Sequence, residues 1–463
     1  MLIRFSVENF LSFKDRQTFS MIAGRGGRDK AFHVVPKSNR KDIDLLKAGV
    51  VFGANASGKS NLIRAIDFGQ KLILKGTETE KPIEYQHFRL DKKNSVTTSR
   101  IEYEIKDKGQ TYAYGFVFDK KQIHEEWLYR IDRTKEEKVF ERLRSSHFDL
   151  SPLEKSNSNN ARQFLEFTAK GTPDNQLFLT EIRNRKVKDN VDDVSDLLTV
   201  IDWFQNALTV FYPKSKVKGV EFELSENTQL ATVFEEFLKY FDTGIDGIQL
   251  KKIDFDKIDI PARIREEIKS DLLNSKSEKT NAWIENPLEN VRYFISRTPD
   301  GEIETRKLMT QHRIHGAKNQ FDLFDINDES DGTQRIMDFI PILIDLFKGD
   351  NVFIVDEMER SLHANLIYDL FDLFLSGSKQ TNGQLIVASH ESSLLTQKLL
   401  RKDEIWFAVK DQFGASSLYS LEEYDVRFDK QIRKDYLNGR YRAIPRFGNR
   451  NNLSVLKNAK RED

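Results

Sequence analysis

Residues 53–60 read G-A-N-A-S-G-K-S and match the phosphate-loop pattern G-x-x-x-x-G-K-[ST] at every fixed position. An apolar run, 48–52, precedes them and a helical pattern, 61–74, follows. The glycines let the backbone wrap so that successive N–H groups point at one anion, and the helix adds the positive end of its dipole. The pattern therefore predicts a strand–loop–helix unit of an α/β fold that binds a nucleotide phosphate.

Two side chains of this loop carry the chemistry of a nucleotide site. Lys59 can reach the β- and γ-phosphates, and the Ser60 hydroxyl can ligate Mg²⁺. We therefore expect ATP and Mg²⁺ to bind here. The residues expected to contact the nucleotide are Gly53, Asn55, Ser57, Gly58, Lys59, Ser60 and Asn61. A glycine-rich turn before an ordinary helix is the competing interpretation, and the agreement of both flanks argues against it.

The last part of the chain alternates continuous apolar runs with helical patterns, which is typical of a parallel sheet buried on both faces. The apolar runs are 351–355, 384–388 and 404–409, and the helical patterns between them are 362–375 and 391–400.

Polar residues follow two of these predicted strands. Asp356 and Glu357 end the first, and Ser389 and His390 end the second. Ligands bind outside the carboxyl ends of the strands in an open parallel sheet. We expect Asp356 to hold Mg²⁺, Glu357 to act as the general base, and His390 to donate a hydrogen bond to the γ-phosphate.

Small and hydroxyl residues also precede a predicted helix at 336–348, in the segment 329–335, E-S-D-G-T-Q-R. Such residues at a helix N-terminus can bind a second anion, although a simple helix cap is the default interpretation.

Strand patterns dominate the N-terminal part and helical patterns the middle. Residues 2–23 predict two strands joined by a turn, and 100–106, 111–118 and 122–129 predict an antiparallel meander. Helical patterns at 174–212, 226–241 and 261–277 follow, and no heptad repeat is long enough for an extended coiled coil. The expected parts are an N-terminal lobe (1–180), a mainly helical insertion (181–300), a C-terminal lobe (301–445) and a basic tail (446–463).

Composition excludes several classes of function. The chain has 463 residues and no cysteine, so thiol catalysis and cysteine-ligated metals are absent. Its 73 basic residues equal its 73 acidic ones, which argues against a globally basic nucleic-acid binder and leaves DNA contact to the tail. No apolar run approaches a membrane span, and the first residues lack a signal-peptide layout, so we expect a cytoplasmic protein without a membrane partner.

The order of these motifs resembles the ATP-binding-cassette (ABC) ATPases of the SMC, RecF and OLD group. In that family two heads sandwich two ATPs, and each site combines the phosphate loop of one head with the signature of the other. The resemblance implies that Ser330, Gly332 and Gln334 fill the signature, usually L-S-G-G-Q, from which the chain departs at Glu329 and in the glycine spacing.

Three further segments extend this likeness. Residues 361–363, S-L-H, occupy the D-loop position, and His390 matches the switch histidine. Residues 8–14, E-N-F-L-S-F-K, resemble the first hairpin of the group. Gln86 is the candidate for the glutamine that the family places near the γ-phosphate. The resemblance implies an α/β ABC-ATPase head with an antiparallel β subdomain, a mostly parallel nucleotide-binding sheet and a helical insertion.

A narrower likeness concerns 87–91, 114–116, 126–129 and 436–441, which look like compact AAA ATPases of bacterial phage-defence operons of the RloA and PARIS (AriA) kinds. This resemblance implies an ATPase that senses phage infection and controls a separate toxic effector. OLD-type enzymes carry a TOPRIM nuclease that needs a paired Asp-x-Asp, and none follows His390. We therefore expect a companion nuclease in trans.

The expected partners follow from the same likeness. They are a second copy in an ATP-sandwich dimer or a larger oligomer, the nuclease effector, and a phage-encoded protein trigger. Two alternatives stay open: a RecF- or SMC-like DNA-repair ATPase that binds DNA through the tail, and an ATP-gated scaffold with little turnover.

Overall fold

The chain folds as two compact units, one comprising Met1–Pro213, Leu346–Glu359 and Tyr368–Asp463, the other Lys214–Asp345 and Arg360–Ile367. This computed structural model describes residues 1–445 except 26–29, 38–41, 133–134, 144–146, 186, 188–190, 192, 218–219, 259, 275–280, 287–290, 299, 319, 380 and 425–430. The predicted basic tail, 446–463, and the DNA contact assigned to it lie outside the described residues.

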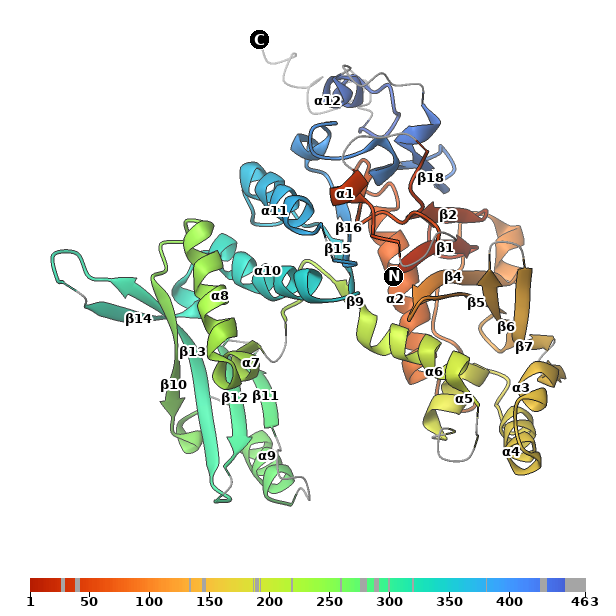
Figure 1. Ribbon diagram of the computed structural model, residues 1–463, viewed down its shortest axis with the longest axis horizontal. Helices are drawn as coiled ribbons and strands as arrows, with labels where there is room; N and C mark the ends of the chain where they lie inside the picture. Colours follow the sequence, from red (N-terminus) through yellow and green to blue (C-terminus); the bar gives the residue numbers. More distant parts are fainter. Residues whose placement is uncertain are drawn as a thin grey trace, which may run out of the picture. The chain divides into compact units, whose positions relative to one another are not determined.

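The first unit contains a seven-stranded antiparallel sheet that confirms the predicted meander (Figure 1). In spatial order its strands are β2 (Gln17–Ser20), β1 (Leu2–Glu8), β4 (Ser99–Asp107), β5 (Gln110–Phe118), β6 (Ile123–Asp132), β7 (Lys135–Leu143) and β8 (His147–Asp149). Alternating burial along β4 shows that one face of this sheet lies against the core.

The first unit also contains a six-stranded, mostly parallel sheet, as the apolar runs predicted. Its order is β18 (Ser416–Ser420), β17 (Ile405–Lys410), β3 (Ala48–Phe52), β16 (Gln384–Ser389), β15 (Val352–Asp356) and β9 (Leu208–Phe211), with β18 the one antiparallel member among the described strands. Strands β3 and β15 are buried along their whole length. Because β3 and β15 each pair in parallel with β16, the carboxyl ends of these three strands lie side by side at one edge of the sheet.

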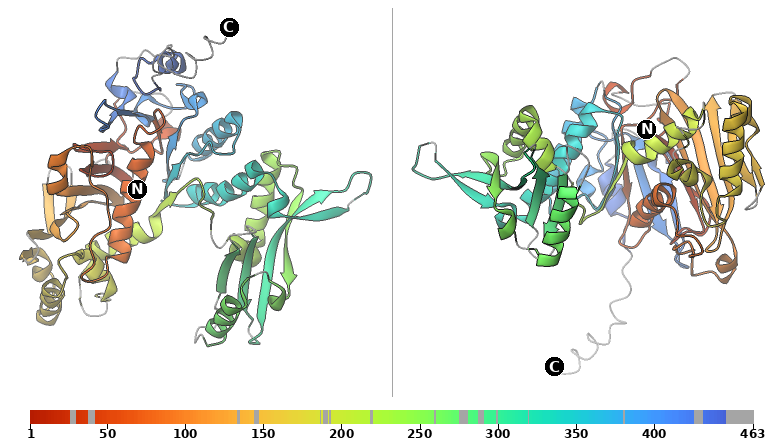
Figure 2. Two further views of the ribbon diagram at one scale, coloured as in Figure 1. Left: turned by 180° about the vertical axis from the view of Figure 1, so that it is seen from behind. Right: turned by 90° about the horizontal axis from the view of Figure 1, so that it is seen from below.

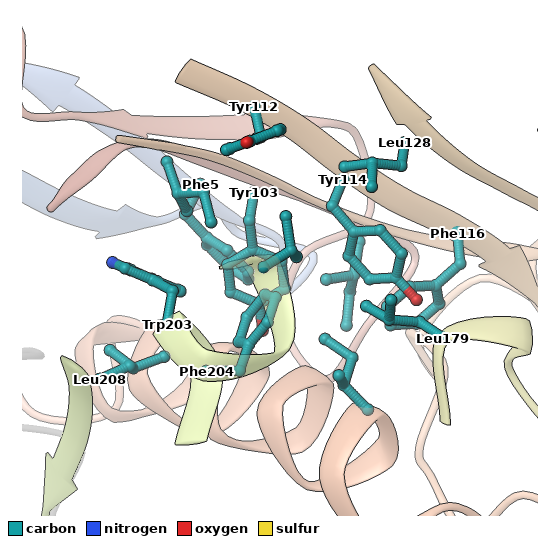
Figure 3. Packing of buried hydrophobic residues seen from close by; sticks show 14 of the residues in the cluster. Phe5, Tyr103, Tyr112, Tyr114, Phe116, Leu128, Leu179, Trp203, Phe204 and Leu208 are labelled. Carbon is teal, nitrogen blue, oxygen red and sulfur yellow. The ribbon is translucent and has the colours of Figure 1, made fainter. Parts of the chain in front are cut away.

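Aromatic packing fixes the helix that follows the phosphate loop, α2 (Lys59–Lys75), against the antiparallel sheet. The Tyr103 hydroxyl donates to the Ile66 carbonyl at 2.6 Å, and a Cβ at Gly69 would lie 2.2 Å from that hydroxyl oxygen. The centroid of the Tyr103 ring lies 4.9 Å from the ring centroids of both Phe5 and Phe204 (Figure 3). The core that holds α2 is thus largely aromatic, which accounts for part of the high phenylalanine content.

The remaining helices of the first unit are short. They are α1 (Lys30–His33), α3 (Ser151–Lys155), α4 (Asn159–Lys170), α5 (Phe178–Asn184), α6 (Ser195–Asp202) and α12 (Ile432–Leu437). Two longer helices, α10 (Asp331–Lys348) and α11 (Ala364–Gly377), contribute residues to both units. In the described part of the chain, no helix combines the length and apolar character that crossing a bilayer requires.

The second unit contains a sheet that the prediction of a mainly helical insertion missed. Its strands are β10 (Gly247–Ile253), β13 (Ile303–Arg313), β12 (Val291–Arg297) and β11 (Asn281–Asn286), and β14 (Phe321–Asp325) also pairs with β13 (Figure 2). The helices predicted at 226–241 and 261–277 do occur, as α8 (Thr228–Tyr240) and α9 (Ala262–Asn274), and a further helix that was not predicted, α7 (Val220–Glu226), precedes them. The strands were missed because charged residues such as Lys251 and Lys252 interrupt their apolar alternation.

Two helix predictions need correction. The segment 391–400 forms a short 3₁₀ turn, Ser392–Leu394, and further turns in place of a helix. Helix α10 begins at Asp331, five residues before the predicted start at Ile336, because Ser330 caps it: the Ser330 Oγ accepts a hydrogen bond from the Thr333 N–H at 3.1 Å.

Candidate nucleotide site

The phosphate loop joins β3 to α2 as the sequence predicted, and its two motif glycines are required by close contacts. A Cβ at Gly53 would lie 2.5 Å from the Ala408 carbonyl oxygen. Gly58 has φ 115°, in the region that favours glycine, and a Cβ there would lie 2.4 Å from the Ser416 Oγ. A larger residue would therefore be strained at either position.

Lys59 is buried in this loop, with 5% of its surface exposed. Its Nζ donates to the carbonyl oxygens of Gly53 at 2.9 Å and Ala54 at 3.2 Å, and lies 3.0 Å from the His390 Nε2. Burial lowers the pKa of Lys59 to about 8, against the opposing effect of nearby carboxylates. A phosphate anion bound in the loop would stabilise the charged form of Lys59, which burial disfavours.

Ser60 and Asp356 meet as the strand-end rule predicted. The Ser60 Oγ donates to the Asp356 Oδ1 at 3.0 Å. Asp356 is 4% exposed, and burial raises its pKa, while the hydrogen bond from Ser60 acts in the opposite direction. A hydroxyl and a carboxylate at this distance supply the oxygen ligands that Mg²⁺ prefers.

Glu357 and His390 stand at the same sheet edge. Glu357 is half-buried and has φ 48°, a left-handed conformation that is uncommon for a residue with a side chain. Burial and the Lys59 ammonium lower the pKa of His390, which keeps the imidazole neutral at physiological pH.

Polar side chains from outside the motif hold the loop in place. The Ser12 Oγ accepts a hydrogen bond from Asn61 Nδ2 and shares another with the Ser416 Oγ, each at 2.8 Å. The Ser416 hydroxyl also lies 2.7 Å from the Ser57 carbonyl oxygen. Ser12 belongs to the N-terminal motif that the sequence singled out, so the structure gives that motif a role: it fixes the start of α2.

The Ser57 Oγ indicates whether the loop fits a bound phosphate. Among the described residues, the buried Ser57 Oγ has no hydrogen-bond partner. A buried polar atom of this kind normally has a partner, and a phosphate oxygen in the loop would provide one. Asn55 is exposed on the same loop. Together with the flanking glycines and Lys59, these residues fit a bound nucleotide phosphate.

The predicted signature residues Ser330, Gly332 and Gln334 lie in the second unit. The Gln334 Nε2 donates to the Glu329 carbonyl at 2.9 Å, and a Cβ at Gly332 would lie 2.9 Å from the Ser361 carbonyl oxygen. Ser330 is exposed at the start of α10.

Glu329, the departure from the usual signature, has a structural role that the sequence did not reveal. Its Oε1 accepts a hydrogen bond from Thr310 Oγ1 at 2.5 Å and lies 2.6 Å from His312 Nε2. Both partners belong to β13, so the carboxylate ties the signature to the insertion sheet.

Comparison with known families agrees with this geometry. Residues 50–396 match the family model described as "AAA domain, putative AbiEii toxin, Type IV TA system". The chain belongs to this family. The matched region contains the phosphate loop, Asp356 and His390, which lie at the ends of the neighbouring strands β3, β15 and β16.

Solved structures with a weak likeness are heads of SMC proteins. The SMC head domain from Thermotoga maritima is 10% identical, with a TM-score of 0.36 over 90% of this chain and 98% of that one. An Smc head with an extended coiled coil, bound to the C-terminal domain of ScpA derived from Pyrococcus furiosus, is 12% identical, with a TM-score of 0.36 over 91% and 97%. No curated protein matches the chain.

Sequence reasoning missed two contributors to the site. Ser416 follows no motif, and its approach to Gly58 depends on the pairing of β17 with β3. Glu359 accepts hydrogen bonds from the Ser389–His390 segment. Gln86 remains only a candidate: its side chain is exposed, and its backbone carbonyl accepts from the Leu11 N–H.

Proposed function

We propose that the chain is a Mg²⁺-dependent ATPase that assembles around ATP and controls a separate toxic effector. The observation that supports hydrolysis most directly is the convergence of Lys59, Ser60, Asp356 and His390, from three separate strand ends, at hydrogen-bonding distance. A loop that only bound a nucleotide would need Lys59, but it would not need a buried carboxylate beside Ser60.

Each residue then has a defined part. Mg²⁺, held by Ser60 and Asp356, would neutralise charge on the β- and γ-phosphate oxygens. Lys59 exchanges its contacts with the Gly53 and Ala54 carbonyls for phosphate oxygens. Glu357 orients the attacking water and accepts its proton, and neutral His390 donates a hydrogen bond to the γ-phosphate.

Steady-state phosphate release tests this assignment. Wild-type protein should release phosphate from ATP in a Mg²⁺-dependent manner, and Glu357→Gln should bind ATP but turn over at least about 100-fold more slowly. Glu391→Gln is the matched control, since its carboxylate accepts a hydrogen bond from the Ser393 N–H and has no role in the proposed reaction. Wild-type turnover by Glu357→Gln would refute the base assignment, and an inactive wild type would favour the ATP-gated scaffold.

Assembly through ATP is the second part of the proposal. In this assembly Ser330, which is exposed at the N-terminus of α10, would contact the γ-phosphate bound by another copy. Native mass spectrometry should therefore show dimers or larger even-numbered oligomers with ATP and Mg²⁺ and fewer without them. Oligomers that do not respond to ATP would contradict the sandwich arrangement.

Control of an effector in phage defence is the third part. The family description names a putative toxin of a type IV toxin–antitoxin system, which supports a role in a defence operon. Expression of the chain with its neighbouring genes should reduce phage plating, and Lys59→Ala should abolish that protection. Stimulation of ATP hydrolysis by DNA, lost on removal of 446–463, would instead favour the RecF- or SMC-like DNA-repair role.

A further inference from the structure

Glu359 lies two residues beyond the proposed base and bonds to the backbone that carries the switch histidine. Its Oε1 accepts a hydrogen bond from the His390 N–H at 2.6 Å, and its Oε2 accepts one from the Ser389 Oγ at 2.8 Å. Each carboxylate oxygen of Glu359 therefore accepts one hydrogen bond, and the two donors belong to successive residues. Charge-assisted hydrogen bonds of this kind are stronger than neutral ones and define geometry more closely.

The serine in this pair of hydrogen bonds is buried, and its hydroxyl is fully engaged. Ser389 has no exposed surface, and its hydroxyl, while donating to Glu359, accepts from the Glu391 N–H at 2.9 Å. The chain turns away from the sheet immediately after Ser389, where the ladder to β3 ends at the Phe52 pair. The first N–H beyond the ladder thus bonds to the carboxylate of Glu359.

The turn after Asp356 directs Glu359 to this position. Asp356 is the last residue of β15, Glu357 adopts the left-handed conformation, and Met358 is buried at 1% exposure. Met358 anchors the turn in the core, and Glu359 is directed back toward the neighbouring strand, β16. The segment that carries Asp356 and Glu357 is thereby joined to the one that carries His390.

Glu359 also lies near the Lys59 ammonium group of the phosphate loop. Among nearby carboxylates, it has the largest electrostatic effect on Lys59, ahead of Asp356 and Glu357, and it acts to raise the pKa of both Lys59 and His390. Removing its charge should therefore alter His390 even in the absence of nucleotide.

We propose that Glu359 is a positioning residue, which holds the Ser389–His390 backbone so that the imidazole meets Lys59 and the γ-phosphate. This inference rests on the ATPase activity proposed above. It predicts that Glu359 affects turnover chiefly through His390, and that its electrostatic effect on Lys59 changes ATP affinity little.

A double-mutant cycle tests the inference. Glu359→Ala should lower kcat about 10- to 100-fold while KM changes less than about threefold, the range seen when a supporting carboxylate is removed. The Glu359→Ala/His390→Ala double variant should be no slower than His390→Ala alone. Glu391→Gln, which removes the carboxylate beside His390 that bonds to Ser393, is the control and should keep wild-type turnover. Multiplicative loss in the double variant, or wild-type kcat for Glu359→Ala, would overturn the proposal.

A second readout does not depend on turnover. The chain has eight histidines, and a His390→Ala spectrum identifies the His390 resonance in an NMR titration of the nucleotide-free protein. Glu359→Gln keeps the shape and one acceptor oxygen, so it should fold, and it should lower the pKa of His390, whereas Glu391→Gln should leave it unchanged. An unchanged His390 pKa would overturn the proposal. An inactive wild type with a shifted His390 pKa would refute the ATPase function and leave the positioning contact intact.

Discussion

Lys59→Met should have opposite effects on the empty and the ATP-bound protein. Burial lowers the pKa of Lys59 from 10.5 to about 8. At about 1.4 kcal/mol per unit, holding the ammonium charged costs the empty folded protein about 3 kcal/mol at neutral pH. Methionine removes that cost but also removes the two bonds to the loop carbonyls, worth about 1 kcal/mol each. The net prediction is a gain of about 1 kcal/mol in unfolding free energy.

The pH dependence separates these contributions. Because the folded pKa of Lys59 is depressed, the unfolded state binds more protons between the folded value, about 8, and the ordinary value of 10.5. Wild-type stability therefore rises with pH across this window relative to Lys59→Met. The variant should be more stable at pH 7, and less stable by about 2 kcal/mol once the pH exceeds 10.5, where only the lost hydrogen bonds remain.

Urea denaturation at several pH values, without nucleotide, measures this difference. Lys71→Met is the control, because Lys71 lies on the same helix but is exposed and pairs with Asp67 at 2.6 Å; its effect should stay within about 0.5 kcal/mol at every pH. With ATP present, Lys59→Met should bind about 10- to 100-fold more weakly, the loss of one charge-assisted contact. A Lys59→Met variant that is destabilised at pH 7 by an amount independent of pH would refute the reasoning.

Four further substitutions test the rest of the structure. Glu357→Gln should trap ATP with phosphate release reduced at least about 100-fold, as measured by single-turnover kinetics. Gly58→Ala, which forces a Cβ against the Ser416 Oγ at φ 115°, should cost about 2 kcal/mol in unfolding free energy by urea denaturation and weaken ATP binding. Ser330→Arg should bind ATP normally in a filter assay but lose ATP-dependent association in native mass spectrometry. Glu126→Ala, which leaves three buried donors unpaired, should cost about 3 kcal/mol by thermal unfolding.

The parts of the site that the sequence predicted are those set by local rules. The loop at 53–60 is contiguous, so its pattern carries its own geometry. Asp356 and His390 are far apart in sequence, yet each ends a fully apolar run. The strand-end rule placed them together, and the register that pairs Asp356 with Ala388 confirms this.

The residues that the sequence did not reveal depend on pairings between distant segments. Ser416 reaches the loop only because β17 lies beside β3 and β18 returns along it. The insertion sheet was missed for a different reason. Its strands pack against a small core around Ile258, Tyr293 and Ile295, and consecutive charged residues such as Lys251 and Lys252 break the alternation that would have marked a strand.

Glu329 and Glu359 show how an acidic residue beside a motif can hold the geometry of that motif. Each is an acidic residue beside a motif element, and each uses its carboxylate to connect that element to a neighbouring strand: Glu329 to β13 through Thr310 and His312, Glu359 to the end of β16. A leucine in place of Glu329 could only pack, and packing is tolerant of small rotations. A carboxylate with two donors sets direction as well as distance. The 330–334 segment and His390 are therefore each held within their own unit before any nucleotide binds, which would lower the conformational cost of the proposed binding of ATP between two copies.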